Sequence, residues 1–270
     1  MSDEDLPLTS LLDALSKEVN TVLNNLPIKV EVEGGDFNAE DIPSSSSNTW
    51  VKLPEVVAVV CDLKGSTHLG TGKHDTSTAR IYTSGVEGAV RIFHEFGADF
   101  IDIQGDGGFG LFWGDRAYER AVCAAVTMRT FSEDFVGQLE KRWPDQLPET
   151  GFKVGIHAAR TLVKRIGTRR VASEQEALWA GKPVNYAAKC AQTADRHQVI
   201  MTKDVWEKMK NNDYIAFSCD CNGGPTAKLW TDVTVDRLPE EDRDAVVLTA
   251  PWCKTCGPGF CAAIMAGEAR

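Results

Sequence analysis

Two short acidic stretches hold the residue types best suited to chemistry. In the first, the apolar run 55–61 leads into Asp62 and then into the loop 63–67, Leu-Lys-Gly-Ser-Thr. In the second, another apolar run enters Gly105-Asp106-Gly107-Gly108. If the two runs are neighbouring strands, Asp62 and Asp106 meet at one edge of a sheet. A pair of carboxylates beside a glycine-rich loop suits a divalent cation and phosphate groups.

The elements that position these residues can be inferred from the patterns along the chain. Residues 54–210 alternate between strand-like and helix-like patterns, which predicts an α+β domain with a layered sheet and helices on one face. Residues 1–32 contain an amphipathic helix suited to packing or dimerisation, with apolar residues at helical spacing from Leu8 to Leu23. Residues 33–53 are rich in Gly and Ser and are expected to form a linker. Residues 211–270 form a small Cys-rich C-terminal segment.

The composition restricts the class of protein. A chain of 270 residues that is 43% hydrophobic can build one sizeable core with an appendage. The net charge of −10 argues against a nucleic-acid or anionic-membrane surface. Apolar runs stay below the length of a membrane span, and the acidic start of the chain is unlike a signal peptide. We therefore expect a soluble, cytoplasmic protein with no nucleic-acid or membrane partner.

Four motifs in residues 54–210 together resemble the class III nucleotidyl cyclases. Asp62 to Thr67 resembles the Asp-Ile-x-Gly-(Phe/Ser)-Thr of that family, and Gly105-Asp106 resembles its second metal motif. Val154 to His157 resembles its Val-Gly-Ile-His segment, and Gly181 to Lys189 resembles its Gly-x-x-Val-Asn-x-Ala-(Ala/Ser)-Arg helix. The resemblance implies a ferredoxin-like, antiparallel-rich sheet and a nucleotidyl cyclase activity.

The resemblance also implies a metal and phosphate site. Asp62, Asp106 and the carbonyl of Leu63 would bind two divalent ions per site, Mg²⁺ or Mn²⁺. One ion would activate the ribose 3′-hydroxyl, and the other would hold the triphosphate. The backbone amides that follow Asp62 would cradle the phosphates. These phosphate-binding positions are Lys64, Gly65, Ser66 and Thr67.

The last motif supplies two further catalytic candidates. Asn185 would orient the ribose, and Lys189 stands where the family has a transition-state arginine. The spacing of four residues puts both side chains on one helix face. A lysine keeps the charge of arginine but loses its bidentate fork. In the family these two residues come from the partner subunit, so a homodimer with two shared active sites is implied.

Two positions that select the base in the family differ here from the enzymes that use ATP. Asp102, four residues before Asp106, replaces their lysine, and Leu178, seven residues before Asn185, replaces their Asp or Thr. A carboxylate can accept uracil N3–H or cytosine N4–H₂, and a bulky Leu178 would shrink the pocket. Arg80, on the helix after the first motif, could reach the base or serve a surface role.

The whole pattern, including the run 105–113, resembles the bacterial pyrimidine cyclases of Pycsar anti-phage systems. This resemblance implies conversion of UTP to 3′,5′-cyclic UMP and pyrophosphate, a second messenger that activates a separate effector. UTP is favoured over CTP because cytosine N3 is an acceptor and would be repelled by a carboxylate. CTP, a purine substrate, and a non-catalytic nucleotide-sensing homologue (suggested by Lys189) remain alternatives.

Five of the eight cysteines crowd into the last fifth of the chain. In a reducing compartment such clustering favours metal binding over disulfides. The segment resembles a small sensor-like domain found after some bacterial cyclases. A structural Zn²⁺ bound by four thiols is the hypothesis, and reduced thiols in a small core are the alternative. The expected ligands are Cys221, Cys253, Cys256 and Cys261.

Overall fold

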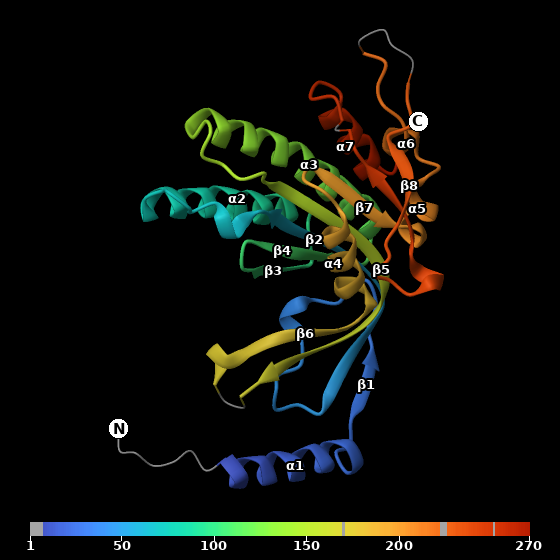
Figure 1. Ribbon diagram of the computed structural model, residues 1–270. Helices are drawn as coiled ribbons and strands as arrows, with labels where there is room; N and C mark the ends of the chain where they lie inside the picture. Colours follow the sequence, from blue (N-terminus) through green and yellow to red (C-terminus); the bar gives the residue numbers. More distant parts are fainter. Residues whose placement is uncertain (1–7, 169–170, 222–225, 251) are drawn as a thin grey trace.

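The computed structural model describes residues 8–168, 171–221, 226–250 and 252–270. Its described strands form one nine-stranded mixed sheet in the order β3-β4-β2-β5-β7-β9-β8, with β1 beside β2 and β6 beside β5 (Figure 1). The strands are β1 Lys29–Val32, β2 Thr49–Lys64, β3 Phe100–Gln104, β4 Gly107–Phe112, β5 Gly151–Gly167, β6 Gln175–Gly181, β7 Gln198–Thr202, β8 Trp230–Thr234 and β9 Asp244–Leu248. The α-helices are α1 Leu8–Asn24, α2 Asp75–Glu95, α3 Ala117–Arg142, α4 Lys182–Thr193, α5 Lys203–Met209, α6 Asp213–Ala216 and α7 Gly257–Ala266. The α+β class is confirmed.

Two long strands, β2 and β5, form the centre of the sheet. They pair antiparallel, and β2 is flanked on its other side by β4, again antiparallel. The continuous apolar run in β2 is explained by burial on both faces of the sheet. Beyond the centre, the first part of β2 and the last part of β5 continue as an arm with β1 and β6, in the lower part of Figure 1.

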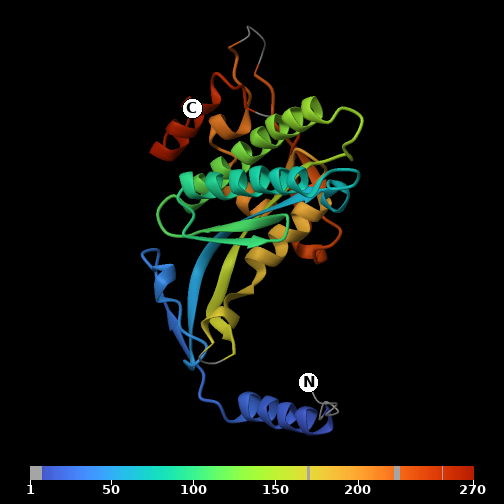
Figure 2. The same cartoon turned by 90° about the vertical axis from the view of Figure 1, so that its left-hand side faces the viewer.

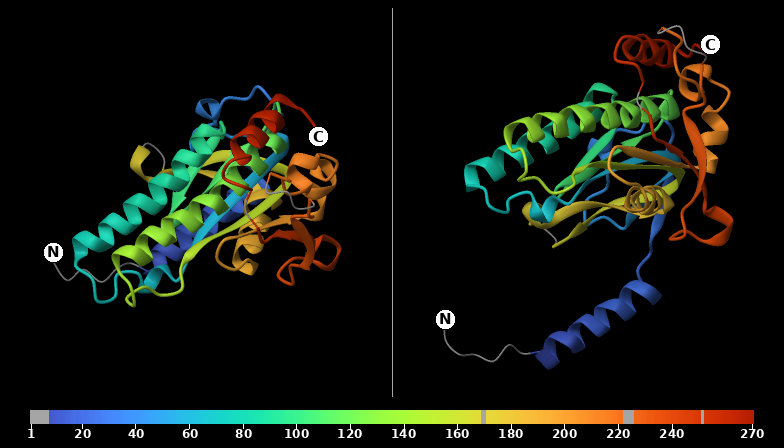
Figure 3. Two further views of the ribbon diagram at one scale, coloured as in Figure 1. Left: turned by 90° about the horizontal axis from the view of Figure 1, so that it is seen from above. Right: turned by 45° about the horizontal axis from the view of Figure 1, so that its top comes forward.

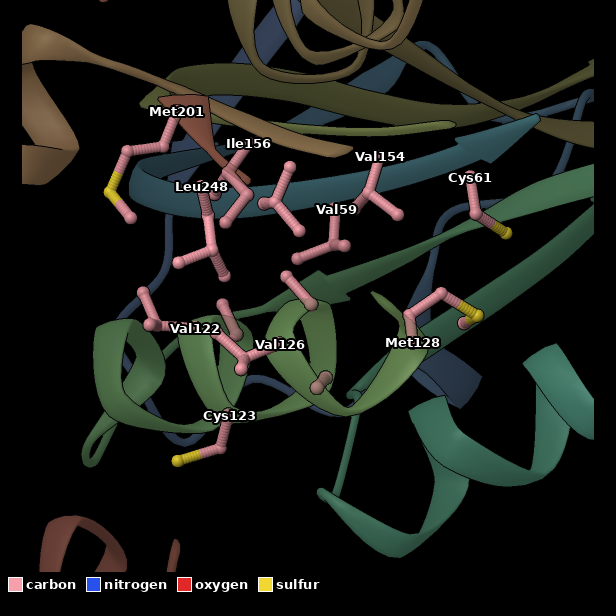
Figure 4. Close-up of a cluster of buried hydrophobic side chains, with 14 of the residues drawn as sticks. Val59, Cys61, Val122, Cys123, Val126, Met128, Val154, Ile156, Met201 and Leu248 are labelled. Atoms are coloured by element: carbon pink, nitrogen blue, oxygen red, sulfur yellow. The ribbon is translucent and has the colours of Figure 1, made fainter. Parts of the chain in front are cut away.

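Helices α2 and α3 cover one face of the sheet side by side (Figures 2 and 3). The core between this face and α3 contains Val59 of β2 and Ile156 of β5, which point toward Val122 and Val126 of α3 (Figure 4). The side chains alternate along each strand, so residues 57, 59, 61 and 63 of β2 face these helices.

Helix α4 packs on the opposite face. A Cβ on Gly155 of β5 would lie 1.9 Å from the carbonyl oxygen of Ala187 and 2.5 Å from the nitrogen of Ala191. Only a glycine permits this close approach of helix and strand. Helices α2 and α3 lie on one face of the sheet, as predicted. Helix α4 lies on the other face, which corrects the prediction that all helices share one face.

The segment 33–53, expected to be a linker, is part of the folded domain. Val51 and Leu53 lie within β2 and are buried, and Ile42 is 5% exposed. The indole nitrogen of Trp113 donates a hydrogen bond to the carbonyl oxygen of Phe37 at 2.9 Å. The Gly and Ser content of this stretch concealed isolated apolar residues that reach the core.

The C-terminal segment 211–270 also differs from the expected separate unit. Strands β8 and β9 extend the same sheet, because β9 pairs antiparallel with β7. Trp230, Leu248 and Trp252 lie in the main core together with residues of β2, β5 and α3. Residues 54–210 and 211–270 therefore share one hydrophobic core.

Helix α1 stands apart from the sheet at the end of the arm (Figure 1). It has no buried residue, and seven of its apolar side chains are exposed. These are Leu8, Leu11, Leu12, Leu15, Val19, Val22 and Leu23. Among the residues that the structure describes, no helix combines the length and apolarity that a membrane crossing requires.

Candidate active site

The two acidic turns meet at one end of the sheet. Strands β2 and β4 pair so that Cys61 lies opposite Gly108. A Cβ on Gly107 would lie 2.1 Å from the carbonyl oxygen of Cys61 and 3.1 Å from the Cα of Asp62. The turn that carries Asp106 is therefore pressed against the backbone at Asp62. Gly105, at φ +65°, takes the left-handed conformation that lets the chain reverse there.

The buried thiol of Cys61 responds to both carboxylates. Burial, together with the nearby charges of Asp62 and Asp106, raises the pKa of Cys61 to about 12. A single side chain that feels both charges indicates that the carboxylates converge. Asp62 and Asp106 thus lie at one edge of the sheet, as the sequence predicts.

The oxygens of this pair fit a divalent metal. The Asp62 side chain is 41% exposed, so its carboxylate is accessible to an ion and to a nucleotide. Carboxylate oxygens are the hard donors that Mg²⁺ and Mn²⁺ prefer. The side chain of Leu63 is buried in the core, so only its backbone can contribute to the site.

Lys153 is a site residue that the sequence reasoning missed. It lies opposite Asp62 in the β2–β5 ladder, and its Nζ is 2.6 Å from Asp62 Oδ2. The Lys153 side chain is only 16% exposed, which strengthens the attraction. Its position directly before the Val154–His157 motif, on the strand paired with the first acidic stretch, is the signal that could have identified it.

The loop after Asp62 can offer backbone groups to a phosphate, whereas the side chain of Lys64 is already paired with carboxylates. Gly65 has φ +71°, and a Cβ there would lie 2.7 Å from the carbonyl oxygen of Glu149. Lys64 binds Asp195 at 2.5 Å and Glu149 at 2.9 Å, and these contacts hold the pKa of Lys64 above its usual value.

Ser66 and Thr67 begin the short 3₁₀ helix η2 (Ser66–His68), beside the metal candidates. The Tyr82 hydroxyl donates a hydrogen bond to the Ser66 carbonyl oxygen at 2.9 Å, which ties this loop to α2. Thr67 is exposed. The loop is therefore held in shape from one side and accessible at its tip.

Asp102 lies on the same face of the sheet as Asp62. It pairs with Phe109 of β4, which pairs with Val60 of β2, two residues before Asp62. At about 4.8 Å per strand, Asp102 is about 10 Å across the sheet from Val60. Gln104 donates a hydrogen bond to Asp102 Oδ2 at 3.2 Å. A nucleotide with its phosphates at Asp62 could therefore reach Asp102 with its base.

Asn185 is not brought to the carboxylates within one chain. Its amide donates to the Gly181 carbonyl oxygen at 3.0 Å, and Gly181 abuts Arg160 of β5. Asp62 pairs with Lys153, seven residues earlier on β5, which is about 23 Å of strand. Helix α4 runs back from there over β5, where Ala187 and Ala191 contact Gly155, so Asn185 lies between these two points with its amide bonded to the start of its own helix.

Lys189 lies one helical turn after Asn185. Its Nζ is 5.3 Å from the centre of the Tyr186 ring, and the Tyr186 hydroxyl in turn donates to Asp242 at 3.0 Å. Both catalytic candidates on α4 are accessible enough to meet another chain, since Asn185 is exposed and Lys189 is half-buried.

The remaining base-selecting candidates do not converge on Asp102 in one chain. Leu178 of β6 is 47% exposed. Its neighbour Trp179 is buried, with its ring 5.0 Å from Phe100, so Leu178 faces away from that contact. Arg80 is exposed on α2, which covers the face of the sheet opposite Asp102.

His157 of the third motif has a structural position beneath α4. Its Nδ1 is 2.9 Å from Thr202 Oγ1 of β7, and its ring is 4.8 Å from the ring of Tyr186. Burial lowers the pKa of His157 to about 4, so the ring is neutral at physiological pH.

Four cysteines form a second cluster of ligand atoms, near the C-terminus. The sulfurs of Cys219, Cys221, Cys253 and Cys256 all lie within 4.8 Å of one another. Backbone N–H groups of residues 256 and 255 donate to the Cys253 sulfur and lower its pKa to about 6. Cys261 was expected to belong to this set but does not, because its thiol contacts Cys123 of α3.

No family model matches the chain. Curated relatives do: a uridylate cyclase from Propioniciclava tarda is 83% identical over 270 residues, covering 100% of this chain and 88% of the relative. A uridylate cyclase from Micromonospora echinofusca is 45% identical over 269 residues, covering 98% of this chain and 87% of the relative.

A solved structure confirms the fold. The adenylyl cyclase CyaB from P. aeruginosa superimposes with a TM-score of 0.60 over 74% of this chain and 96% of its own, at 13% identity. At this identity the likeness concerns the fold alone. The chain therefore belongs to the family of the uridylate cyclases, and it has the class III nucleotidyl cyclase fold.

Proposed function

We propose that this protein converts UTP to 3′,5′-cyclic UMP and pyrophosphate. The observation that carries the proposal is the convergence of Asp62 and Asp106 at the end of the β2–β4 pair. The names of the two relatives, 83% and 45% identical, support UTP as the substrate. We infer that the product is an anti-phage second messenger in the cytoplasm, read by a separate effector.

In this reaction the ribose O3′ forms a bond to the α-phosphorus. The bond from that phosphorus to the pyrophosphate oxygen breaks, and the proton of the 3′-hydroxyl passes to water or to the leaving pyrophosphate. Two Mg²⁺ or Mn²⁺ ions, when bound, would supply Lewis acidity for the hydroxyl and the triphosphate. Asp62 and Asp106 would hold them, and the backbone of residues 63–67 would hold the phosphates. Lys153 would move from Asp62 to the triphosphate, because the bound ions satisfy the carboxylate.

The base would be selected at Asp102. Its carboxylate can accept the N3–H of uracil, whereas N3 of cytosine is an acceptor and would be repelled. Asp102 lies on the same face of the sheet as Asp62, beside the side chain of Gln104. Leu178 would complete the pocket from a second chain, whereas Arg80 lies on the other side of the sheet and keeps a surface role.

We infer a homodimer with two shared sites. Asn185 and Lys189 would act beside the Asp62 and Asp106 of the partner, because the contacts they make in their own chain are to Gly181 and to the Tyr186 ring and not to the carboxylates. A two-fold axis then creates two equal sites. The exposed apolar residues of α1 support a second copy as the partner. Their positions 8, 12, 15, 19 and 22 follow the alternating spacing of four and three typical of a two-stranded coiled coil.

The substrate is tested by incubating the purified protein separately with UTP, CTP, ATP and GTP in Mn²⁺. Cyclic products are identified by mass spectrometry. We expect cyclic UMP as the main product. Cyclic CMP as the main product would move the proposal to CTP, and product from a purine nucleotide alone would overturn it.

The shared site is tested by mixing two inactive variants, Asp62→Ala and Asn185→Ala, after reversible dissociation. Half of the random dimers are mixed, and each mixed dimer has one intact site, so about one quarter of wild-type activity should return. Each variant treated alone is the control and should stay inactive. Absence of recovery, with subunit exchange shown by mass, would contradict the shared site.

A further inference from the structure

We propose that four cysteines bind one structural Zn²⁺ that fastens the C-terminal end of the chain to the cyclase core. The ligands are Cys219, Cys221, Cys253 and Cys256. They come from two loops more than 30 residues apart, one after α6 and one before α7. This set is independent of the site at Asp62, and its assignment does not depend on the nucleotide that the protein uses.

The distances between the sulfurs fit a tetrahedral metal. Cys219 and Cys221 Sγ are 3.2 Å apart, and Cys221 and Cys253 Sγ are 3.4 Å apart. These values exceed a covalent S–S bond of about 2.05 Å. A Zn²⁺ with four Zn–S bonds of about 2.3 Å separates its sulfurs by about 3.8 Å. These two pairs therefore need to spread by only about half an ångström to close around the ion, and all four sulfurs already lie within 4.8 Å of one another.

The local backbone already has the form of a metal-binding turn. Within Cys253-Lys254-Thr255-Cys256, the N–H of Cys256 donates to the carbonyl oxygen of Cys253 at 3.1 Å, and the N–H of Gly257 does so at 2.7 Å. This reversal brings the sulfurs of Cys253 and Cys256 to the same side. Helix α7 begins directly afterwards, so its first turn is part of the site.

The donor set selects the metal. Four thiolates without a carboxylate or a water position favour Zn²⁺ over Mg²⁺ or Mn²⁺, which prefer oxygen. A closed set of four protein ligands is typical of structural zinc, whereas catalytic zinc keeps an open position. The site therefore has no reactive role of its own.

The site acts by holding α7 and its loop in place. Phe260 and Ile264 of α7 belong to the main core, but the helix has only ten residues. A helix of this length is marginal unless it is fixed by its surroundings. Two contacts tie the turn and the residues before it to α3. Lys254 in the turn pairs with Asp134 at 2.5 Å, and Arg129 donates to the carbonyl oxygen of Thr249, before the turn, at 2.6 Å.

Cys261 provides a matched control inside the same segment. Its thiol pairs with that of Cys123, between α7 and α3, outside the group of four. Substitution of Cys261 and substitution of Cys219 each remove one sulfur near α7. Only the second removes a ligand of the proposed ion.

The experiment measures zinc in wild type, Cys219→Ser and Cys261→Ser, each purified under reducing conditions with no added metal. We expect about one zinc per chain in wild type and in Cys261→Ser, and at least about tenfold less in Cys219→Ser. Cobalt-exchanged wild type should show the visible bands and thiolate charge-transfer bands of a tetrahedral Co²⁺ site. Cys219→Ser should also melt at a lower temperature.

The proposal is overturned if wild type contains no zinc and also gives no tetrahedral Co²⁺ spectrum. This test does not depend on whether Cys219→Ser folds. Equal zinc loss in Cys261→Ser and Cys219→Ser would also overturn this ligand set. Both readouts are taken without nucleotide. A protein that carries zinc but makes no cyclic UMP would therefore contradict the proposed function and leave the zinc proposal intact.

Discussion

Two groups of ligand atoms in this molecule differ in almost every property that decides what a bound metal does. Asp62 and Asp106 offer oxygens at a strand end and a turn, partly exposed, with Lys153 pairing with one carboxylate. The four cysteines offer only sulfur and surround one point. A site for reaction must admit substrate and exchange its ions, whereas a structural site must close. The same chain offers both kinds of donor set on different elements.

The comparison also shows how each group is held without metal. The carboxylate of Asp62 is neutralised by a lysine that can move away when ions and triphosphate arrive. The sulfur of Cys253 is held by backbone N–H groups, which remain in place when a metal binds. Metal and substrate can therefore replace the lysine at Asp62, whereas the N–H groups at Cys253 stay in place.

The largest effect is expected from Asp62→Asn. The amide keeps the shape of the side chain but loses the negative charge that attracts a divalent ion, so cyclase activity should fall roughly a thousandfold. Zinc content should stay at the wild-type level, because the thiols are untouched. Glu87→Gln, on the exposed side of α2, removes an equal charge and should change neither quantity. Activity above a tenth of wild type in Asp62→Asn would break the assignment of the oxygen site.

A smaller effect is expected from Lys153→Met, which removes the counter-charge of Asp62 but keeps the length of the side chain. Mn²⁺ binding to the nucleotide-free protein, followed by electron paramagnetic resonance, should become tighter because no ammonium competes. Turnover should fall about tenfold because the triphosphate loses a cation. Lys203→Met is the control, since its ion pair with Asp232 is exposed. Unchanged Mn²⁺ affinity in Lys153→Met would refute the replaceable counter-charge.

The last effect concerns stability rather than turnover, at the link between the two regions. The ring of His157 on β5 is hydrogen-bonded to Thr202 of β7. Strand β7 in turn pairs with β9 of the C-terminal segment 211–270. The folded pKa of His157 is about 4, below the 6.5 of the unfolded chain. Between these values the unfolded chain binds a proton that the folded chain does not. Stability should therefore fall as the pH is lowered from 6.5 to 4, by at most about 3 kcal/mol.

The measurement is urea unfolding across this pH range in wild type and His157→Gln. The variant should lose this part of the pH dependence, while the single transition of the shared core is retained. An equal slope in both proteins would contradict the assignment. Two separate transitions in wild type would show that the catalytic and C-terminal parts fold independently.

Much of the active site could be predicted from local sequence. Asp62 and Asp106 each end or follow an apolar strand pattern beside glycines, and a hairpin between two strands limits where such turns can lie. Asn185 and Lys189 share a helix face through their spacing alone. The cyclase fold was expected from the resemblance of four motifs, in their order, to the class III nucleotidyl cyclases.

Tertiary structure decided what depends on register, alternation and distant contacts. The register of β5 places Lys153 opposite Asp62, and the amide of Asn185 donates to Gly181 at the start of its own helix. Folding of the C-terminal segment onto α3 directs Cys261 toward Cys123, so Cys219 takes its place in the thiol group. Residues 33–53 join the core through isolated apolar side chains.

The sequence by itself therefore determined most of the candidate residues for the chemistry, because residue type and short spacing are written along the chain. The structure decided which of them share a site, because that depends on strand pairing and packing between residues far apart in sequence.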